Sequence, residues 1–148
     1  MQHLSLYKKK KINSLFFSIL NIFWYLLGQH LLYTEFIPFY SFRVFILRLF
    51  FSKIGKGVVI KPRVKVKFPW KLSIGDNSWI GELAWIDNLA QVSIGSDVCI
   101  SQGVYICTGN HNRSIQTFDL MLQPVSIQNQ SWVGAFAKIA PNVTIGES

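Results

Sequence analysis

The feature that most constrains this chain is an aliphatic residue that recurs every six positions within four successive stretches, which begin at residues 54, 74, 94 and 127. The row comprises Ile54, Ile60, Val66, Ile74, Ile80, Ile86, Ile94, Ile100, Ile106, Ile127, Val133, Ile139 and Ile145. A period of six repeats one short strand and one turn, and three such units close a triangular coil of about 18 residues. One coil cannot bury its own apolar side, so coils must stack. The repeat therefore predicts a solenoid of short parallel strands with the aliphatic row inside.

Composition places the chain among single-domain proteins with an anionic partner. It has 148 residues, half of them hydrophobic, and a formal net charge of +8. Such a charge suits a membrane surface, phosphate groups or an acidic polysaccharide. No nucleic-acid-binding motif is present, so nucleic acid is not an expected partner. Cys99 and Cys107 form no C-x-x-C pair and are expected to be small residues of the repeat in a reducing compartment.

The chain divides into two parts. Residues 54–148 carry the repeat, whereas residues 1–53 form an apolar lead-in that begins with the lysine run Lys8–Lys11. Segment 13–34 has no formal charge and is long enough to span a bilayer as a helix. We expect it to lie on a membrane or pack against the base of the coils; a true span and a secretory signal are the alternatives. Segment 36–51, which contains Pro38, is expected to form an amphipathic helix.

The repeat contains one long insertion and then stops abruptly. Residues 107–126 lack the six-residue period and are polar at first, which indicates a loop inserted at a coil corner. Insertions of this kind lie on one face of a solenoid, often the functional one. The repeat resumes at Ile127 and ends in mid-period at residues 145–148, with no atypical capping element. We therefore expect the chain to be truncated at its C-terminus.

One histidine is a candidate for chemistry. His3 and His30 lie in the lead-in, and His111 lies at the start of the inserted loop between two asparagines. An imidazole is the natural general base near neutral pH. From the residues alone, a solvated loop histidine is the competing interpretation.

Several segments resemble a known family. They are Thr108-Gly-Asn-His-Asn112, Pro124, Ile127 and Ser131-Trp-Val-Gly-Ala135. Together with the repeat, they are similar to the hexapeptide-repeat acyltransferases, whose fold is a left-handed parallel β-helix. Segments 53–70 and 79–82 resemble the exopolysaccharide O-acetyltransferases of the colanic-acid type. The resemblance covers most of residues 36–148.

The resemblance implies an activity and a site. His111 would act as general base, taking a proton from a sugar hydroxyl that attacks the thioester of acetyl-CoA. Acetyl-CoA would lie along a coil edge near Trp132, Gly134 and Ala135. The family assembles as a homotrimer with each site between neighbouring subunits, and its chains continue past the position of Ser148 with further coils that complete the acetyl-CoA site.

The acceptor site departs from the pattern of related sugar acetyltransferases. Those enzymes place an Asn about thirty residues before the His, where this chain has Gly81. The residues left as candidates to orient His111 or to bind the sugar are Glu82, Asp87, Asn88 and Asn110. Turn and cap roles are the alternative for the first three.

Three other functions compete with O-acetyl transfer to an exopolysaccharide sugar. They are N-acetyl transfer to an amino sugar, an inactive truncated trimeric β-helix, and a β-helix metalloenzyme of the carbonic anhydrase type. The last needs about three His ligands on zinc, and the coils contain only His111, so no metal is expected. Because acetyl-CoA is cytoplasmic, we expect the coils in the cytoplasm, in peripheral contact with the inner membrane and acting on a sugar or a lipid-linked oligosaccharide.

Overall fold

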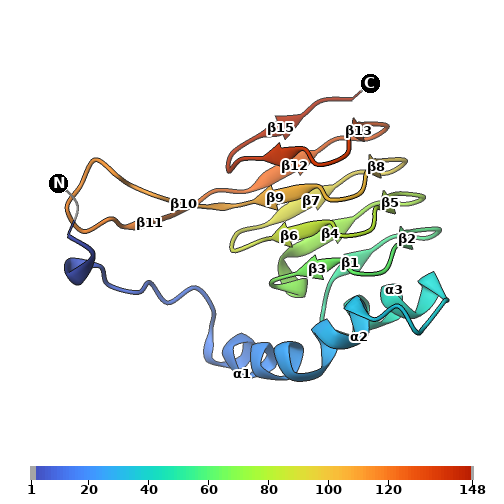
Figure 1. Ribbon diagram of the computed structural model, residues 1–148, viewed down its shortest axis with the longest axis horizontal. Coiled ribbons are helices and arrows are strands. Elements are labelled where there is room, and N and C mark those ends of the chain that lie inside the picture. The colour runs from blue at the N-terminus through green and yellow to red at the C-terminus, as the bar shows by residue number, and fades with distance from the viewer. Residues whose placement is uncertain (1–2, 148) are drawn as a thin grey trace.

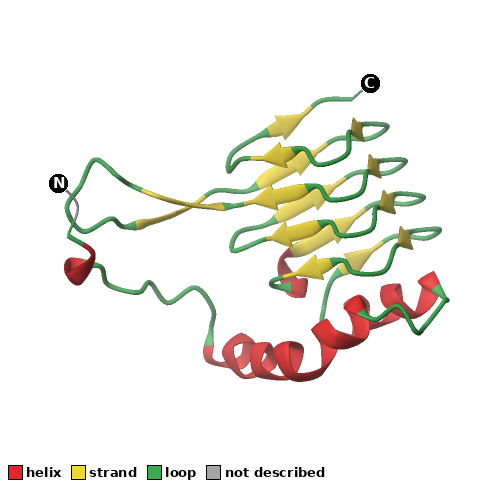
Figure 2. Cartoon of the chain, in the orientation of Figure 1, coloured by secondary structure: helices red, strands yellow, loops and turns green. Residues whose placement is uncertain are grey.

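The computed structural model describes residues 3–147, and from residue 53 onward these wind into stacked triangular coils (Figures 1 and 2). Three parallel sheets form the sides of the stack. The first holds β1 (Lys53–Ile54), β4 (Leu72–Ile74), β7 (Val92–Ile94), β12 (Val125–Ile127) and β15 (Thr144–Ile145). The second holds β2 (Val59–Ile60), β5 (Trp79–Ile80), β8 (Cys99–Ile100) and β13 (Trp132–Val133). The third holds β3 (Lys65–Val66), β6 (Trp85–Asp87), β9 (Tyr105–Cys107) and β14 (Lys138–Ile139).

The aliphatic row lies inside the stack in register, as the sequence predicts. On the second sheet, for example, Ile60 pairs with Ile80, Ile80 with Ile100, and Ile100 with Val133. Members of the row from Ile54 to Ile139 are buried, and Ile145, in the last coil, is partly buried. Since Ile100 is only 1% exposed, the predicted register and parallel β-helix fold are confirmed.

The corners are tight. A side chain at Gly75 would place its Cβ 2.6 Å from the backbone of the next coil, at Gly95 and Ser96. Several other corner residues adopt a left-handed φ near 60°, among them Asn77 and Asp97. Asn and Asp tolerate this conformation better than most residues.

The lead-in is helical and lies across the base of the stack (Figure 1). After a short 3₁₀ turn, η1 (Leu4–Leu6), a continuous helical segment consists of α1 (Leu15–Phe23), the π-helical turn η2 (Trp24–Gly28) and α2 (Gln29–Tyr33). Helix α3 (Tyr40–Leu49) then leads into β1, in the segment where an amphipathic helix is predicted. A further 3₁₀ turn, η3 (Pro69–Lys71), lies between β3 and β4, where the aliphatic row steps by eight residues from Val66 to Ile74.

Side chains of the lead-in pair with backbone groups that the first coil leaves open. The Trp24 indole donates to the carbonyl of Val66 (2.8 Å), and the Gln29 amide accepts from the Val66 N–H (3.2 Å). Arg48 donates to the carbonyls of Ile54 and Gly55. An uncovered strand edge invites pairing with another chain. The helices therefore act as a cap on the first coil.

A buried arginine holds the turn between α2 and α3. Arg43 is fully buried, and its guanidinium donates to the carbonyls of Leu32 (3.2 Å), Thr34 (2.6 Å) and Ile37 (3.0 Å). Burial lowers the pKa of Arg43. These bonds satisfy the carbonyls of Leu32 and Thr34 at the end of α2, which have no helical partner, and that of Ile37 in the connection to α3.

Replacing Ile100 by Asp should abolish cooperative folding. An unpaired carboxylate in the stack would cost several kcal/mol, a large part of the stability of a domain of this size. The measurement is a thermal melt followed by circular dichroism. Lys138→Asp, at an exposed position of β14, is the control and should melt within a few degrees of the parent. An Ile100→Asp protein that did the same would contradict the inward row.

Candidate functional site

The site is built on a hairpin that leaves the coil after β9 (Figure 1). Strand β10 (Gly109–His111) pairs antiparallel with β11 (Leu120–Leu122), and His111 lies opposite Leu120. The hairpin occupies the stretch where the sequence predicts an inserted loop. It projects away from the stack, so the side chains it carries lie outside the coil core.

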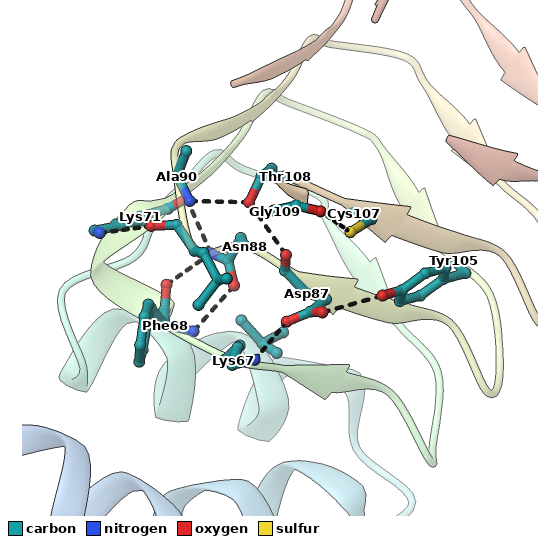
Figure 3. Close-up of polar contacts among 12 residues, drawn as sticks. Lys67, Phe68, Lys71, Asp87, Asn88, Ala90, Tyr105, Cys107, Thr108 and Gly109 are labelled. Carbon is teal, nitrogen blue, oxygen red and sulfur yellow. Dashed lines mark hydrogen bonds and ion pairs between the residues drawn. The ribbon is translucent and has the colours of Figure 1, made fainter. Parts of the chain in front are cut away.

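The root of the hairpin is fixed at a buried corner (Figure 3). The Thr108 hydroxyl accepts from the Ala90 N–H (2.9 Å) and donates to the Asp87 carbonyl (3.2 Å). On the returning strand, the Gln123 N–H donates to the Thr108 carbonyl (2.9 Å). A Cβ at Gly109 would lie 2.7 Å from the Leu89 side chain. The start of the hairpin is thus held by polar bonds and by a lack of space.

The imidazole of His111 is held by two aromatic rings and a carbonyl. Its ring stacks on Phe118, with centroids 4.4 Å apart and planes 4° apart, and the Tyr7 ring meets it edge-on at 5.5 Å. Nδ1 lies 2.7 Å from the Phe118 carbonyl oxygen. The Asn110 side chain accepts from the His111 backbone N–H at 2.8 Å, which helps to shape the strand at this position.

These contacts assign the protonation pattern of the ring. A carbonyl oxygen can only accept, so the neutral imidazole must carry its proton on Nδ1. Nε2 then keeps its lone pair and can accept a proton from a reacting group. Phe118 has a φ of 51°, an uncommon conformation for a bulky residue. Strained backbone of this kind often occurs at functional sites; here it directs a carbonyl at the imidazole.

The acidic candidates lie elsewhere in the coil. The Asp87 carboxylate pairs with Lys67 (2.9 Å) and accepts from the Tyr105 hydroxyl (3.0 Å), as Figure 3 shows. Burial, together with hydrogen bonds to Cys107 and Asp87, raises the pKa of the Tyr105 phenol, which therefore stays a donor. Glu82 is exposed and lies 3.6 Å from Arg63. Neither carboxylate is among the contacts of His111.

Asn88 is committed to the corner of the stack. It is fully buried, and its amide donates to the carbonyls of Phe68 (2.7 Å) and Lys71 (3.0 Å) and accepts from the Phe68 N–H (3.0 Å) (Figure 3). The structure thus gives Asn88 the cap role that the sequence left open as the alternative, and it does not bring the residue to His111. The orienting group is instead the Phe118 carbonyl, a backbone atom that no residue pattern reveals.

The second group of candidates lies on β13 and the turn after it. Trp132 is 74% exposed, and its indole N–H donates to the Ser101 hydroxyl (2.9 Å). Gly134 and Ala135 are exposed, and no atom lies within 4 Å of the position a Gly134 side chain would take. Ser101 also lines an open cleft of about 520 Å³ on the second sheet, together with Trp79. This edge therefore has room for an extended ligand.

The His111 hairpin and the edge at Trp132, Gly134 and Ala135 lie apart within one chain. Strand β13 and the His111 hairpin lie on opposite sides of the stack (Figure 1). Among residues 3–147, no cluster of three or more His, Cys, Asp or Glu side chains is arranged to hold a metal ion. The arrangement offers an oriented base on one side and an open binding edge on the other.

The His111 tautomer can be measured directly. In ¹⁵N spectra of the neutral ring, we expect Nδ1 to carry the proton and Nε2 to be bare, because Phe118 supplies only an acceptor. Exposed His30 is the internal control and should show mainly the Nε2–H form that is usual for a free imidazole. A His111 ring protonated on Nε2 would rule out the proposed orientation.

The chain is similar to a curated protein over most of its length. No known family profile matches it. It is 44% identical over 108 residues to the putative colanic acid biosynthesis acetyltransferase WcaF of Escherichia coli K12. The match covers 73% of this chain and 59% of that protein, so the chain spans less than two thirds of the relative.

Solved structures share the fold. The acetyl-CoA complex of a hexapeptide-repeat-containing acetyltransferase from Vibrio cholerae has a TM-score of 0.80 at 20% identity, covering 95% of this chain and 76% of the other. A maltose O-acetyltransferase from Clostridium difficile has a TM-score of 0.77 at 21% identity, with the same coverage. The chain is thus a left-handed β-helix protein of the hexapeptide-repeat type, and its sequence resembles the colanic-acid-type acetyltransferases.

Proposed function

We propose that this protein transfers an acetyl group from acetyl-CoA to a sugar hydroxyl in exopolysaccharide biosynthesis. The observation that carries the proposal is the oriented ring of His111, whose Nδ1 is 2.7 Å from the Phe118 carbonyl and whose Nε2 is free to accept a proton. The similarity to a colanic acid acetyltransferase supports the same reaction class. No step of this reaction requires a metal.

The proposed reaction uses one proton relay. Nε2 of His111 takes the proton of the acceptor hydroxyl while the oxygen attacks the thioester carbonyl carbon of acetyl-CoA. The Phe118 carbonyl accepts from Nδ1–H and so favours the imidazolium that forms. As the tetrahedral intermediate collapses, the carbon–sulfur bond breaks and the CoA thiolate leaves. The imidazolium then returns the proton to the leaving sulfur, and His111 regains its starting form.

The separation of the two candidate regions supports a site shared between neighbouring subunits, which we propose to be those of a homotrimer. Acetyl-CoA is proposed to lie along the open edge at Trp132, Gly134 and Ala135, on the side of the stack opposite the His111 hairpin (Figure 1). One chain alone would keep the base away from the thioester. Neighbouring copies placed side by side would bring the hairpin of one to the edge of the next.

The acceptor is proposed to bind beside His111. Asn110 flanks the ring, and the carboxylates of Glu82 and Asp87 are further candidates for contacts with the sugar or with a partner subunit. Asn88, being fully buried, would contribute only by holding the corner from which the hairpin departs. We place the reaction in the cytoplasm, where acetyl-CoA is available, with a sugar or a lipid-linked oligosaccharide as acceptor.

Replacing His111 by Ala should lower acetyl transfer by about 10²–10⁴-fold, the usual contribution of a positioned general base. Transfer is measured as release of CoA thiol in the presence of candidate monosaccharide and nucleotide-sugar acceptors. Acetyl-CoA binding should be nearly unchanged, because the imidazole meets the acceptor and not the carrier. His30→Ala is the control and should retain full activity. Retention of most turnover by His111→Ala would remove this residue from the mechanism.

The chemical stability of the product distinguishes O-acetyl transfer from N-acetyl transfer. An ester is released from the acetylated product by mild alkali, whereas an amide from transfer to an amino sugar resists it. A chain that neither binds acetyl-CoA nor releases thiol with any acceptor would favour the non-catalytic β-helix interpretation.

A mixing experiment tests the shared site. Gly134 has open space around it, so Gly134→Trp should fold normally yet block the edge proposed for acetyl-CoA. Mixed oligomers of His111→Ala and Gly134→Trp chains should regain part of the activity that each lacks alone, because some interfaces would combine an intact base with an intact edge. Failure to regain activity, with mixing shown by mass, would contradict a site built from two chains.

A further inference from the structure

The helical segment from α1 to α2 is apolar on both sides, but the coils cover only one of them. Trp24, Gly28 and Leu32 face the stack and are buried. On the other side, large residues recur at helical spacing and lie in the open; these residues, here called the apolar helix face, are Leu15, Phe16, Ile19, Ile22, Phe23 and Leu26. Their side chains are 49–72% exposed. A contiguous apolar patch of this kind on a soluble domain marks an interaction surface.

Phe51 adds to this surface. It follows α3, is 55% exposed, and its ring lies 6.0 Å from that of Phe16. Its φ is 67°, in the left-handed region where helix C-termini favour Gly. A phenyl group here is disfavoured by its backbone and gains little from packing in the isolated chain. It is explained if the ring contacts something outside the chain.

The charged side chains of the first 34 residues are all basic at pH 7. The first 34 residues contain no Asp or Glu, and Lys8–Lys11 immediately precede α1. The four ammonium groups are largely exposed. Large apolar side chains next to a lysine cluster match the physical chemistry of an anionic lipid surface, where acyl chains lie beneath phosphate groups.

We propose that the apolar helix face, with Phe51, docks the protein onto an anionic phospholipid bilayer, with the helix lying in the plane of the membrane. The helix Leu15–Tyr33 is long and apolar enough to cross a bilayer by length and composition. However, a span would remove Trp24 and Gln29 from the β3 backbone at Val66 and uncover the first coil. An in-plane helix keeps these bonds and buries the outer side chains.

Phe51→Gly tests the proposal, because stability and membrane binding should respond in opposite ways. Gly suits the left-handed φ, so the melting temperature should stay the same or rise. Binding to vesicles of phosphatidylcholine and phosphatidylglycerol, measured by flotation, should fall about tenfold, as expected for losing one buried phenyl. Leu83→Gly is the matched control: Leu83 is exposed and has a φ of 61°, but it lies on a coil corner. This variant should bind as the parent does.

The lysines should supply the lipid selectivity. Changing Lys8–Lys11 to Gln should weaken binding to anionic vesicles by about fivefold for each lysine that meets the surface, and high salt should have a similar effect. Binding to pure phosphatidylcholine should change little. Equal binding of the parent to neutral and anionic vesicles, or unchanged binding of Phe51→Gly, would overturn the proposal.

Two further measurements test the alternatives, a helix that spans the membrane and an interface between copies of the chain. Alkaline carbonate should release the vesicle-bound protein if the helix lies in the plane, whereas retention in the bilayer would indicate a span and overturn the geometry. If Phe51→Gly lowers the molar mass of the protein in solution, the surface is instead an interface between copies of the chain, which would also overturn it. Phe51 is not among the contacts of His111, so loss of binding by Phe51→Gly and loss of acetyl transfer are distinct results.

Discussion

The in-register stacking of inward aliphatic side chains is the constraint on which the rest of this structure depends. Each coil contributes one row of Ile or Val and one set of backbone groups, and both are satisfied only by the coil above or below. A stack of this kind is stable in its interior and open at its first edge. The lead-in resolves this at the base, where Trp24, Gln29 and Arg48 pair with backbone groups of the first coil.

The same constraint explains why the candidate chemistry lies on a hairpin. Inward positions must be aliphatic, so a titratable side chain inside the coil would disrupt the stack. A hairpin inserted after β9 leaves the register intact, since β12 rejoins β7 through the pairs Val125–Val92 and Ile127–Ile94. The coil serves as a rigid base, and Thr108 transmits that rigidity to the hairpin through its bonds to the preceding coil.

A feature of this structure can be predicted from the sequence when side chains make its contacts, and it cannot when backbone atoms make them. The six-residue repeat is a side-chain pattern, so it predicts the inward row, the register and the site of the insertion. The orientation of His111 depends on the carbonyl of Phe118, and a backbone atom has no signature in the residue pattern. Asn88 is a different case: its residue type makes it a candidate for contact with the sugar, whereas the structure shows its amide in three backbone hydrogen bonds at a buried corner. Local polarity does not distinguish a ligand contact from a buried cap.

The N-terminal segment connects the apolar helix face to the hairpin that carries His111. It begins beside the hairpin, where the His3 N–H donates to the Gln116 carbonyl (3.1 Å) and the Tyr7 ring lies against His111, and it continues through Lys8–Lys11 into α1. The lysines thus lie between the apolar helix face and the candidate base. An anionic surface that held them would also restrain Tyr7, one of the rings that enclose the imidazole. Because Tyr7 and Lys8–Lys11 are adjacent in the chain, the proposed membrane contact would be connected to the geometry of His111 through one short stretch of chain.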